Sequence, residues 1–420
     1  MKRELDQWRL NVGGDVLGGL VTTFSVIPEV ICFTIVAGMD PIAGLYTSIV
    51  FLVLMSFLGG RPALVSAGAG SMAVVVVSLI RDHGTAYLFA AVLLAGAFQL
   101  VLGVLRIGNL MKYVPKPVLA GFVDALAIII FRSQVSSYLS NMGTGHSGIA
   151  VTILLIAVGI AIVYIAPHFV QKILSTLIAI VCVTLLWLII RAFGSGFEIA
   201  MISDLGNLTA TLPDLALPAV PPNLETVRII FPYAVSLAFV GLLETLLTAW
   251  VVDEMTESDS EKNRECRAQG IGNIVCGLIG AMPGCAMIGQ AITNVRSGGR
   301  GRLSTFVAGC LLAVLLVFGS AILGVVPLAA LIAVMATVAI ATFDWRNLGD
   351  ILFALRDLFS GTPNRAALQN AAVTLLTVVI VVATDNLAYG VAAGLILYGL
   401  FYLISRKSPP RNPETSAEHT

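Results

Sequence analysis

The sequence predicts an all-α polytopic membrane protein with fourteen transmembrane segments, built as two inverted repeats of seven segments each. Three observations lead to this prediction: the composition, the spacing of the apolar segments and the distribution of basic residues. Of the 420 residues, 58% are hydrophobic and only 11% are charged. Soluble domains carry about 25% charged residues. A core shielded from water could not hold so much apolar surface, so we expect lipid to surround the chain.

Apolar segments recur along the whole chain, and several are shorter than the roughly 20 residues of a complete transmembrane helix. They lie at 14–38, 41–58, 64–80, 85–105, 118–139, 148–167, 170–191, 228–251, 268–281, 285–296, 303–323, 326–342, 367–385 and 388–405. The segment 343–358 reads as an amphipathic helix on the inner surface.

The basic residues support this count. With a cytoplasmic N-terminus and alternating spans, nearly all of the 24 Lys and Arg residues fall on the cytoplasmic side, as the positive-inside rule requires. The exceptions are Arg81, Arg132, Arg191 and Arg228. An error in the middle of the count would destroy this asymmetry. We therefore expect both termini to be cytoplasmic, in the plasma (inner) membrane.

An odd number of spans in each half gives the two halves opposite orientations, which is the signature of an inverted repeat. The proline-containing segment 192–227 separates them as an extracellular loop. The expected organisation is a cytoplasmic N-terminus at 1–13, a first repeat at 14–191, this loop, a second repeat at 228–405 and a disordered cytoplasmic tail at 406–420.

The third span of each half is short and rich in glycine, and these two half-spans, the third and the tenth, are the most informative part of the sequence. Broken spans are tolerated where their backbone lines a cavity. Their first-turn amides could hold an anion without any lysine. The residues predicted to do so are Ala69, Gly70 and Ser71 in the first half and Ile288, Gly289 and Gln290 in the second. Close helix packing through small residues is the alternative interpretation.

Glu244 lies in the middle of a predicted span, where a charge costs about 2.5–3.5 kcal/mol on insertion scales. Such an acid normally faces a cavity or a partner. We expect it to carry the coupling ion, although a buried structural hydrogen bond is the alternative. Thr248 lies four residues further on, so it shares a helix face with Glu244. We expect Thr248 to help Glu244 bind the coupling proton, and the oxygen atoms of the same pair could instead coordinate Na⁺.

Glu29 follows Pro28 in the first span, and the proline weakens the helix there. An acid beside a weakened turn suggests a binding site, and Phe33 could form a wall of the same pocket one turn later. Asp124 is a third acidic candidate, but its position near the start of a span also suits a contact at the membrane interface.

Other functional classes find no support in the residues. The sequence contains no HExxH, GxSxG or Walker A motif, so an enzyme is not expected. The histidines fall in predicted loops or in the tail, and the six cysteines form no CxxC pair, so neither a metal site nor a disulfide framework is predicted. No cofactor is expected, and no basic run suits nucleic acid.

The chain resembles the sulfate permease (SulP) family of anion transporters in three stretches. Residues 27–48 are similar to the family signature, residues 241–256 contain the family's membrane acid at Glu244, and residues 263–304 resemble its ninth and tenth spans. In the last stretch the matching positions are Gln269, Gly270, Asn273, Gly280, Pro283, Asn294, Gly298 and Gly299.

This resemblance implies a core domain of spans 1–4 and 8–11, a gate domain of spans 5–7 and 12–14, and a homodimer. It places the anion between the ends of spans 3 and 10. Three departures matter. Glu29 stands where the family often has Gln, Gly289-Gln290 replaces a frequent Ser-Arg pair, and only residues 406–420 follow the last span where members usually carry a STAS domain.

The partners expected from these residues are a small anionic substrate, a coupling proton or sodium ion and the lipid bilayer. Two acids and no arginine suit a dianion that enters with protons, such as the dicarboxylate fumarate. Sodium-coupled bicarbonate transport and proton-coupled sulfate transport remain open alternatives, and so does an anion channel or sensor on the same scaffold.

Overall fold

The computed structural model describes residues 7–9, 11–109, 114–140, 146–168, 174–193, 199–204, 215–359, 364–384 and 387–407. The predicted tail at 406–420 therefore lies almost entirely outside the described residues, and so does part of the loop at 192–227. The first half of the chain contributes the helices α2 (Val12–Ala37), α3 (Pro41–Leu58), α4 (Gly70–His83), α5 (Thr85–Val104), α6 (Lys116–Ser140), α7 (His146–Ile165) and α8 (Leu174–Phe193).

The second half contributes α9 (Leu224–Thr256), α10 (Lys262–Leu278), α11 (Ile288–Arg296), α12 (Arg302–Gly324), α13 (Leu328–Thr342), α14 (Trp345–Phe359), α15 (Arg365–Thr384) and α16 (Leu387–Lys407). Apart from α14, these helices match the fourteen predicted segments one for one. The remaining elements are the strands β1 (Ser66–Gly68) and β2 (Gly284–Ala286) and the 3-10 turns Ala166–His168 and Ile202–Asp204.

By length and composition alone, eight of the described helices could cross a membrane, or nine if α13 and α14, which meet at a 45° bend, form one span. This number is smaller than fourteen for physical reasons. The predicted half-spans α4 and α11 have 14 and 9 residues. Helix α10 has only 17 residues, and its first turns contain the charged residues Lys262, Arg264 and Glu265. For the same reason the hydropathy pattern placed the start of this span at residue 268, which is too late.

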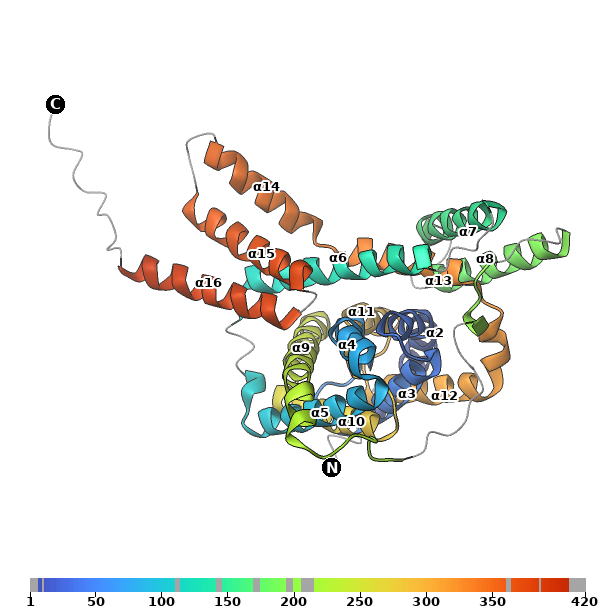
Figure 1. The fold of residues 1–420 in the computed structure, drawn as a ribbon, viewed down its shortest axis with the longest axis horizontal. Coiled ribbons are helices and arrows are strands. Elements are labelled where there is room, and N and C mark those ends of the chain that lie inside the picture. Colours follow the sequence, from blue (N-terminus) through green and yellow to red (C-terminus); the bar gives the residue numbers. More distant parts are fainter. Residues whose placement is uncertain are drawn as a thin grey trace. The chain divides into compact units, whose positions relative to one another are not determined.

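The packing of the helices shows the two-fold character of the repeat. In the first repeat α2 packs on α4, and in the second α9 packs on α11. Contacts across the repeats are matched in the same way: α2 packs on α12 and α11, while α9 packs on α5 and α4. Figure 1 shows the two short helices α4 and α11 between α2 and α9. The inverted repeat predicted from the sequence is therefore present in the contacts.

The two short strands join the halves. Strand β1 runs antiparallel to β2, with Ser66 opposite Ala286 and Gly68 opposite Gly284. Each strand leads directly into a short helix, β1 into α4 and β2 into α11. All six strand residues are buried. Because the strands pair at this point, the N-termini of α4 and α11 are held next to each other.

The contacts divide the chain into two units. The first contains residues 1–112 and 126–342, and the second contains residues 113–125 and 343–420. This division does not follow the expected core and gate, because α7, α8 and α13 pack on one another and fall in the first unit. In the second unit α15 packs on both α14 and α16. A helix, α14, is present where the sequence predicted one at 343–358; it exposes Trp345, Leu352 and Phe353, and its place at the inner surface stays a prediction.

Candidate functional site

The first turns of α4 and α11 form the centre of the candidate site. The residues before them, Ala69 and Met287, have extended backbones and make no capping hydrogen bond through a side chain. The first amides of a helix have no partner within the helix, and the helix dipole makes this end attractive to anions. Since β1 and β2 bring both ends together, they can act on one ligand.

Glu244 of α9 reaches the first turn of α4. Its Oε2 atom accepts a short hydrogen bond from the Ser71 hydroxyl and a second, of 3.3 Å, from the Cys285 thiol on β2. Ser71 and Cys285 are completely buried, and Glu244 is 7% exposed. The acid predicted from the sequence thus lies beside the predicted anion site and contacts elements of both repeats.

Glu29 of α2 occupies the corresponding place in the other repeat. Its carboxyl group interacts with the side chain of Gln290, in the first turn of α11. Glu244 is buried and Glu29 is half-buried, and each lies on the first helix of one repeat and reaches the half-helix of the other repeat. The structure brings together the two acids that the sequence singled out, in equivalent positions around the two helix ends.

The two helix ends differ in exposure. Ala69, Gly70 and Ser71 are buried, and a β-carbon at Gly70 would lie 2.6 Å from the Phe33 ring. The predicted aromatic wall therefore packs directly against the start of α4. On the other side Ile288 is half-buried and Gly289 is exposed. A ligand would reach the site past the first turn of α11.

Thr248 has a different contact from the one expected. It is buried, and its hydroxyl donates a 2.7 Å hydrogen bond to the main-chain oxygen of Glu244 in the turn before it. This bond lies within α9 and does not involve the Glu244 carboxyl group. The neighbouring Thr245 supports the site instead, because its hydroxyl accepts the Ala286 amide at 3.1 Å and so ties β2 to α9.

A set of buried amide side chains is hydrogen-bonded to the backbone of β2. Asn273 accepts the Gly284 amide at 3.0 Å and donates to the Gly284 carbonyl at 3.1 Å, and Gln269 donates to the same carbonyl at 2.8 Å. Asn273 also donates to the Gln99 side chain at 2.8 Å. These bonds satisfy both backbone groups of Gly284 and fix the strand that leads into α11.

We expect Gly284→Ala to lower the stability of the fold. A β-carbon at this position would lie 2.7 Å from the Ala67 carbonyl oxygen on β1, and the paired backbone cannot move away without breaking the strand pairing. Overpacking of this kind costs about 1–3 kcal/mol. Thermal unfolding of the purified protein should show a lower midpoint. Gly319→Ala is the matched control, because no atom lies within 4 Å of the added carbon; equal midpoints for both variants would contradict the expectation.

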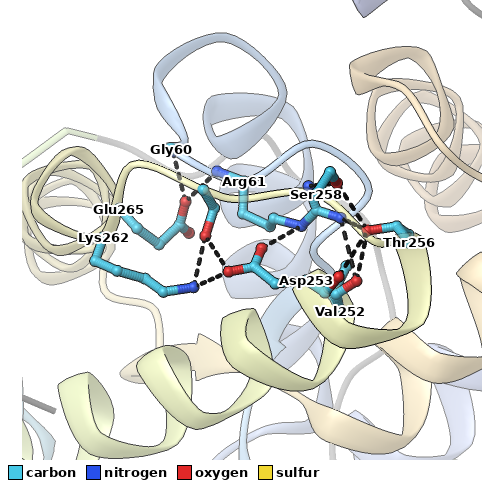
Figure 2. A network of polar contacts seen from close by, with 9 residues as sticks. Gly60, Arg61, Val252, Asp253, Thr256, Ser258, Lys262 and Glu265 are labelled. Carbon is cyan, nitrogen blue, oxygen red and sulfur yellow. Dashed lines mark hydrogen bonds and ion pairs between the residues drawn. The ribbon is translucent and has the colours of Figure 1, made fainter. Parts of the chain in front are cut away.

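A buried ion-pair network holds the turn that leads into β1 (Figure 2). Arg61 is 6% exposed, and its Nε atom lies 3.1 Å from an oxygen of Asp253 near the end of α9. Its other nitrogens donate to Ser258, to Thr256 and to the Val252 carbonyl. Burial lowers the pKa of Arg61, while Asp253 and Glu265 act in the opposite direction. An arginine remains charged at neutral pH.

Helix α10 completes this network. One oxygen of Glu265 accepts the amides of Gly60 and Arg61 at 2.6 and 3.0 Å, and the Lys262 ammonium group pairs with Asp253. The turn before β1 is therefore bound both to the end of α9 and to the start of α10. Since α9 contains Glu244 and β1 leads to Ser71, the network fixes the two partners of the site relative to each other.

Asp124 has a structural role in the second unit. One of its oxygens accepts the Asp344 amide at 2.9 Å, and the other accepts the Asn347 side chain at 2.6 Å. Asp344 in turn accepts the amides of Arg346 and Asn347 and caps α14. The third acidic candidate therefore anchors the start of the amphipathic helix.

We expect Asp124→Ala to loosen the first turn of α14. The change removes two hydrogen bonds around its N-terminus, and losses at such positions cost about 1 kcal/mol. Amide hydrogen exchange across residues 344–350 should become faster. Asp350→Ala is the control, because Asp350 is exposed on the same helix. An unchanged exchange rate in Asp124→Ala would show that Asp124 does not hold this turn.

The sequence did not reveal Cys285 as part of the site. It was interpreted only as a small residue in an apolar segment, and its contact with Glu244 depends on the register of β2 against β1. Its position immediately before a half-helix was the one available signal. Among the described residues, no group of three or more His, Cys, Asp or Glu side chains could hold a metal ion.

Comparisons with known proteins point to one family. The profile of the Sulfate permease family matches residues 12–153 and 141–357. The putative sulfate transporter YbaR of Bacillus subtilis is 44% identical over 397 residues, which cover 94% of this chain and 78% of YbaR. The bicarbonate transporter BicA of a Picosynechococcus strain is 29% identical, over 80% of this chain and 62% of BicA.

Two solved structures share the fold. The transmembrane domain of a cyanobacterial BicA superposes with a TM-score of 0.74 at 25% identity and covers 91% of this chain and 96% of that domain. SLC26A9 superposes with a TM-score of 0.77 at 16% identity, over 94% of this chain and 66% of SLC26A9. With the profile match over most of its length and a relative at 44% identity, the chain belongs to the sulfate permease family.

Proposed function

We propose that the protein is a secondary active transporter that couples the entry of protons to the uptake of a small anion at the ends of α4 and α11. One observation carries this proposal: Glu244 is a buried acid whose carboxyl group lies directly at the N-terminus of a half-helix. An acid at that place repels an anion when it is ionised and tolerates one when it is protonated. Proton and anion therefore favour each other's binding.

The neighbours of Glu244 favour a proton over a sodium ion. Its oxygen is held by a hydroxyl and a thiol, which both act as hydrogen-bond donors. A hard cation such as Na⁺ needs several oxygen ligands, and the hydroxyl of Thr248 is bonded to the main chain. Sodium coupling, which was expected to use Thr248, is the second candidate.

The charge of the site supports a dianion as the substrate. The first turns of α4 and α11 contain no lysine or arginine, and two acids lie beside them. A dianion can bind there once protons neutralise these acids. The name of the relative YbaR favours sulfate, and fumarate represents dicarboxylates of the same charge. The likeness to BicA makes bicarbonate a further candidate.

Uptake into proteoliposomes tests this function. Labelled sulfate, fumarate and bicarbonate are offered separately, each with an inward proton gradient, an inward sodium gradient or no gradient. We expect one anion to accumulate above its external concentration only with the proton gradient. Accumulation driven only by the sodium gradient would show that the coupling ion is sodium and not the proton. Ion currents far above those of a carrier would indicate a channel.

The remaining expectations belong to the same proposal. They are a homodimer, an inner-membrane location with both termini in the cytoplasm, and motion of a core domain of spans 1–4 and 8–11 against a gate of spans 5–7 and 12–14. The domain boundaries predicted from the sequence also remain a proposal. Cross-linking in native membranes and accessibility of tagged termini test the dimer and the orientation.

A further inference from the structure

The two carboxyl oxygens of Glu244 differ in the hydrogen bonds that they accept. Oε2 accepts hydrogen bonds from both Ser71 and Cys285, and the hydrogen bonds made by the described residues leave Oε1 without a donor. The Cys285 thiol also lies 3.7 Å from the Ser71 hydroxyl, so the three groups form one cluster. The cluster joins α9, α4 and β2 and therefore both repeats.

Cys285 is held in place independently of this contact. The amide of the next residue, Ala286, donates to Thr245 on α9, and Gly284 before it is fixed by Asn273 on α10. Cys285 itself lies opposite Ala67 in the strand pair. The backbone of Cys285 is thus fixed on both sides and its side chain is completely buried, so the thiol is placed beside the carboxyl group.

We propose that Cys285 is a positioning residue of the coupling site, which together with Ser71 holds Oε2 of Glu244 so that Oε1 is the atom that takes the proton. This inference rests on the proposed function and deepens it. The two donors stabilise the ionised carboxylate, and the proton that enters binds to the oxygen that has no donor. The O–H group thus formed points away from Ser71 and Cys285.

The elements that pack against α9 carry other charged or titratable groups, but none of these is hydrogen-bonded to the Glu244 carboxyl group in the described residues. They are Arg81, Asp82 and His83 on α4, Tyr87 on α5, Lys262, Arg264, Glu265, Cys266, Arg267 and Cys276 on α10, and Arg296 on α11. Among the titratable groups of these elements, the described hydrogen bonds join only the Cys285 thiol, on β2, to the Glu244 carboxyl group; Ser71, its other donor, does not titrate. The proton affinity of Glu244 should therefore respond to Cys285 in particular.

Two substitutions at this position have opposite expected effects. A hydroxyl is a stronger hydrogen-bond donor than a thiol, so Cys285→Ser should stabilise the carboxylate and move the pH midpoint of Glu244 protonation down. Cys285→Ala removes the donor and should move this midpoint up. A hydrogen bond to a charged group corresponds to a shift of about 1 to 2 pH units. A role in packing alone would not reverse sign between the two variants.

Infrared spectroscopy of the whole protein in lipid bilayers tests the proposal without relying on transport. The difference spectrum between the unmodified protein and Cys285→Ala isolates one S–H stretching band from those of the other five cysteines. We expect this band to lie at lower frequency when Glu244 is ionised, to shift as the pH falls, and to stay fixed in Glu244→Gln. A band that does not respond to pH and is the same in Glu244→Gln would overturn the proposal.

The titration of the protonated-carboxyl band of Glu244 completes the experiment, measured in the unmodified protein, Cys285→Ser and Cys285→Ala. Opposite shifts of its midpoint support the proposal, and equal or absent shifts overturn it. Labelled sulfate uptake over the same pH range separates the two levels of inference. If the bands titrate as expected but a proton gradient drives no anion uptake, the proposed function fails and the role of Cys285 in holding Glu244 stands.

Discussion

Replacing Glu244 with Gln should abolish proton-driven accumulation of the anion. The amide has the shape of the acid and can still accept a hydrogen bond from Ser71, but it cannot bind or release a proton. We expect uptake driven by a proton gradient to fall to the level of liposomes without protein. Exchange of labelled for unlabelled anion should persist, because the site permanently resembles its protonated, anion-binding state. The measurement is initial uptake and exchange in the same proteoliposomes.

Glu254→Gln is the matched control for this variant. Glu254 lies on the same helix, but it is exposed and distant from the half-helices. It should transport like the unmodified protein. If Glu244→Gln still accumulated the anion against its gradient at the normal rate, Glu244 could not carry the coupling proton, and the equivalent acid Glu29 would become the first candidate.

Replacing Arg61 with Ala should cause the largest loss of stability. The guanidinium group is buried, and its loss leaves Asp253 with only Lys262 as a charged partner and removes the donors to Ser258, Thr256 and the Val252 carbonyl. Removing one partner of a buried ion pair costs about 3–5 kcal/mol. Thermal or denaturant unfolding in detergent should show a large decrease. The stability of Arg61→Lys should lie between those of the unmodified protein and Arg61→Ala, since lysine keeps the charge but not the planar group.

The exposed pair of Arg81 and Asp82 supplies the comparison. Its side chains are 73% and 49% exposed, and exposed pairs contribute little to stability because water and salt screen them. Arg81→Ala should therefore change the unfolding midpoint very little. If Arg61→Ala were no more destabilising than Arg81→Ala, the network in Figure 2 would not hold the turn before β1.

The sequence was sufficient for the architecture because each prediction rested on a local pattern. Glycine-rich runs of half-span length marked α4 and α11, and the distribution of basic residues set the number of spans. Glu244 and Glu29 stood out because acids in the middle of an apolar span are costly. These features can be read without knowledge of which segments meet.

The parts that could not be predicted depend on contacts between distant segments. Strands β1 and β2 have three residues each, too few to show an alternating pattern. Arg61 counted only as one of many cytoplasmic basic residues, although its partner Asp253 lies in the other repeat. Cys285 could be linked to Glu244 only once the strand register was known. Thr248 shared a helix face with Glu244 as expected, but its hydroxyl found a nearer acceptor in the main chain.

The pairing of β1 with β2 has a consequence for the electrical balance of transport. Each helix N-terminus acts as roughly half a positive elementary charge, and the strand pair places two such ends at one point. Together they offset about one negative charge by backbone alone. With Glu244 protonated, a monovalent anion would thus be neutralised on arrival, whereas a divalent anion would leave about one charge over for a second proton to cancel. The stoichiometry of proton to anion, measured by the reversal potential of uptake, should therefore follow the valence of the substrate.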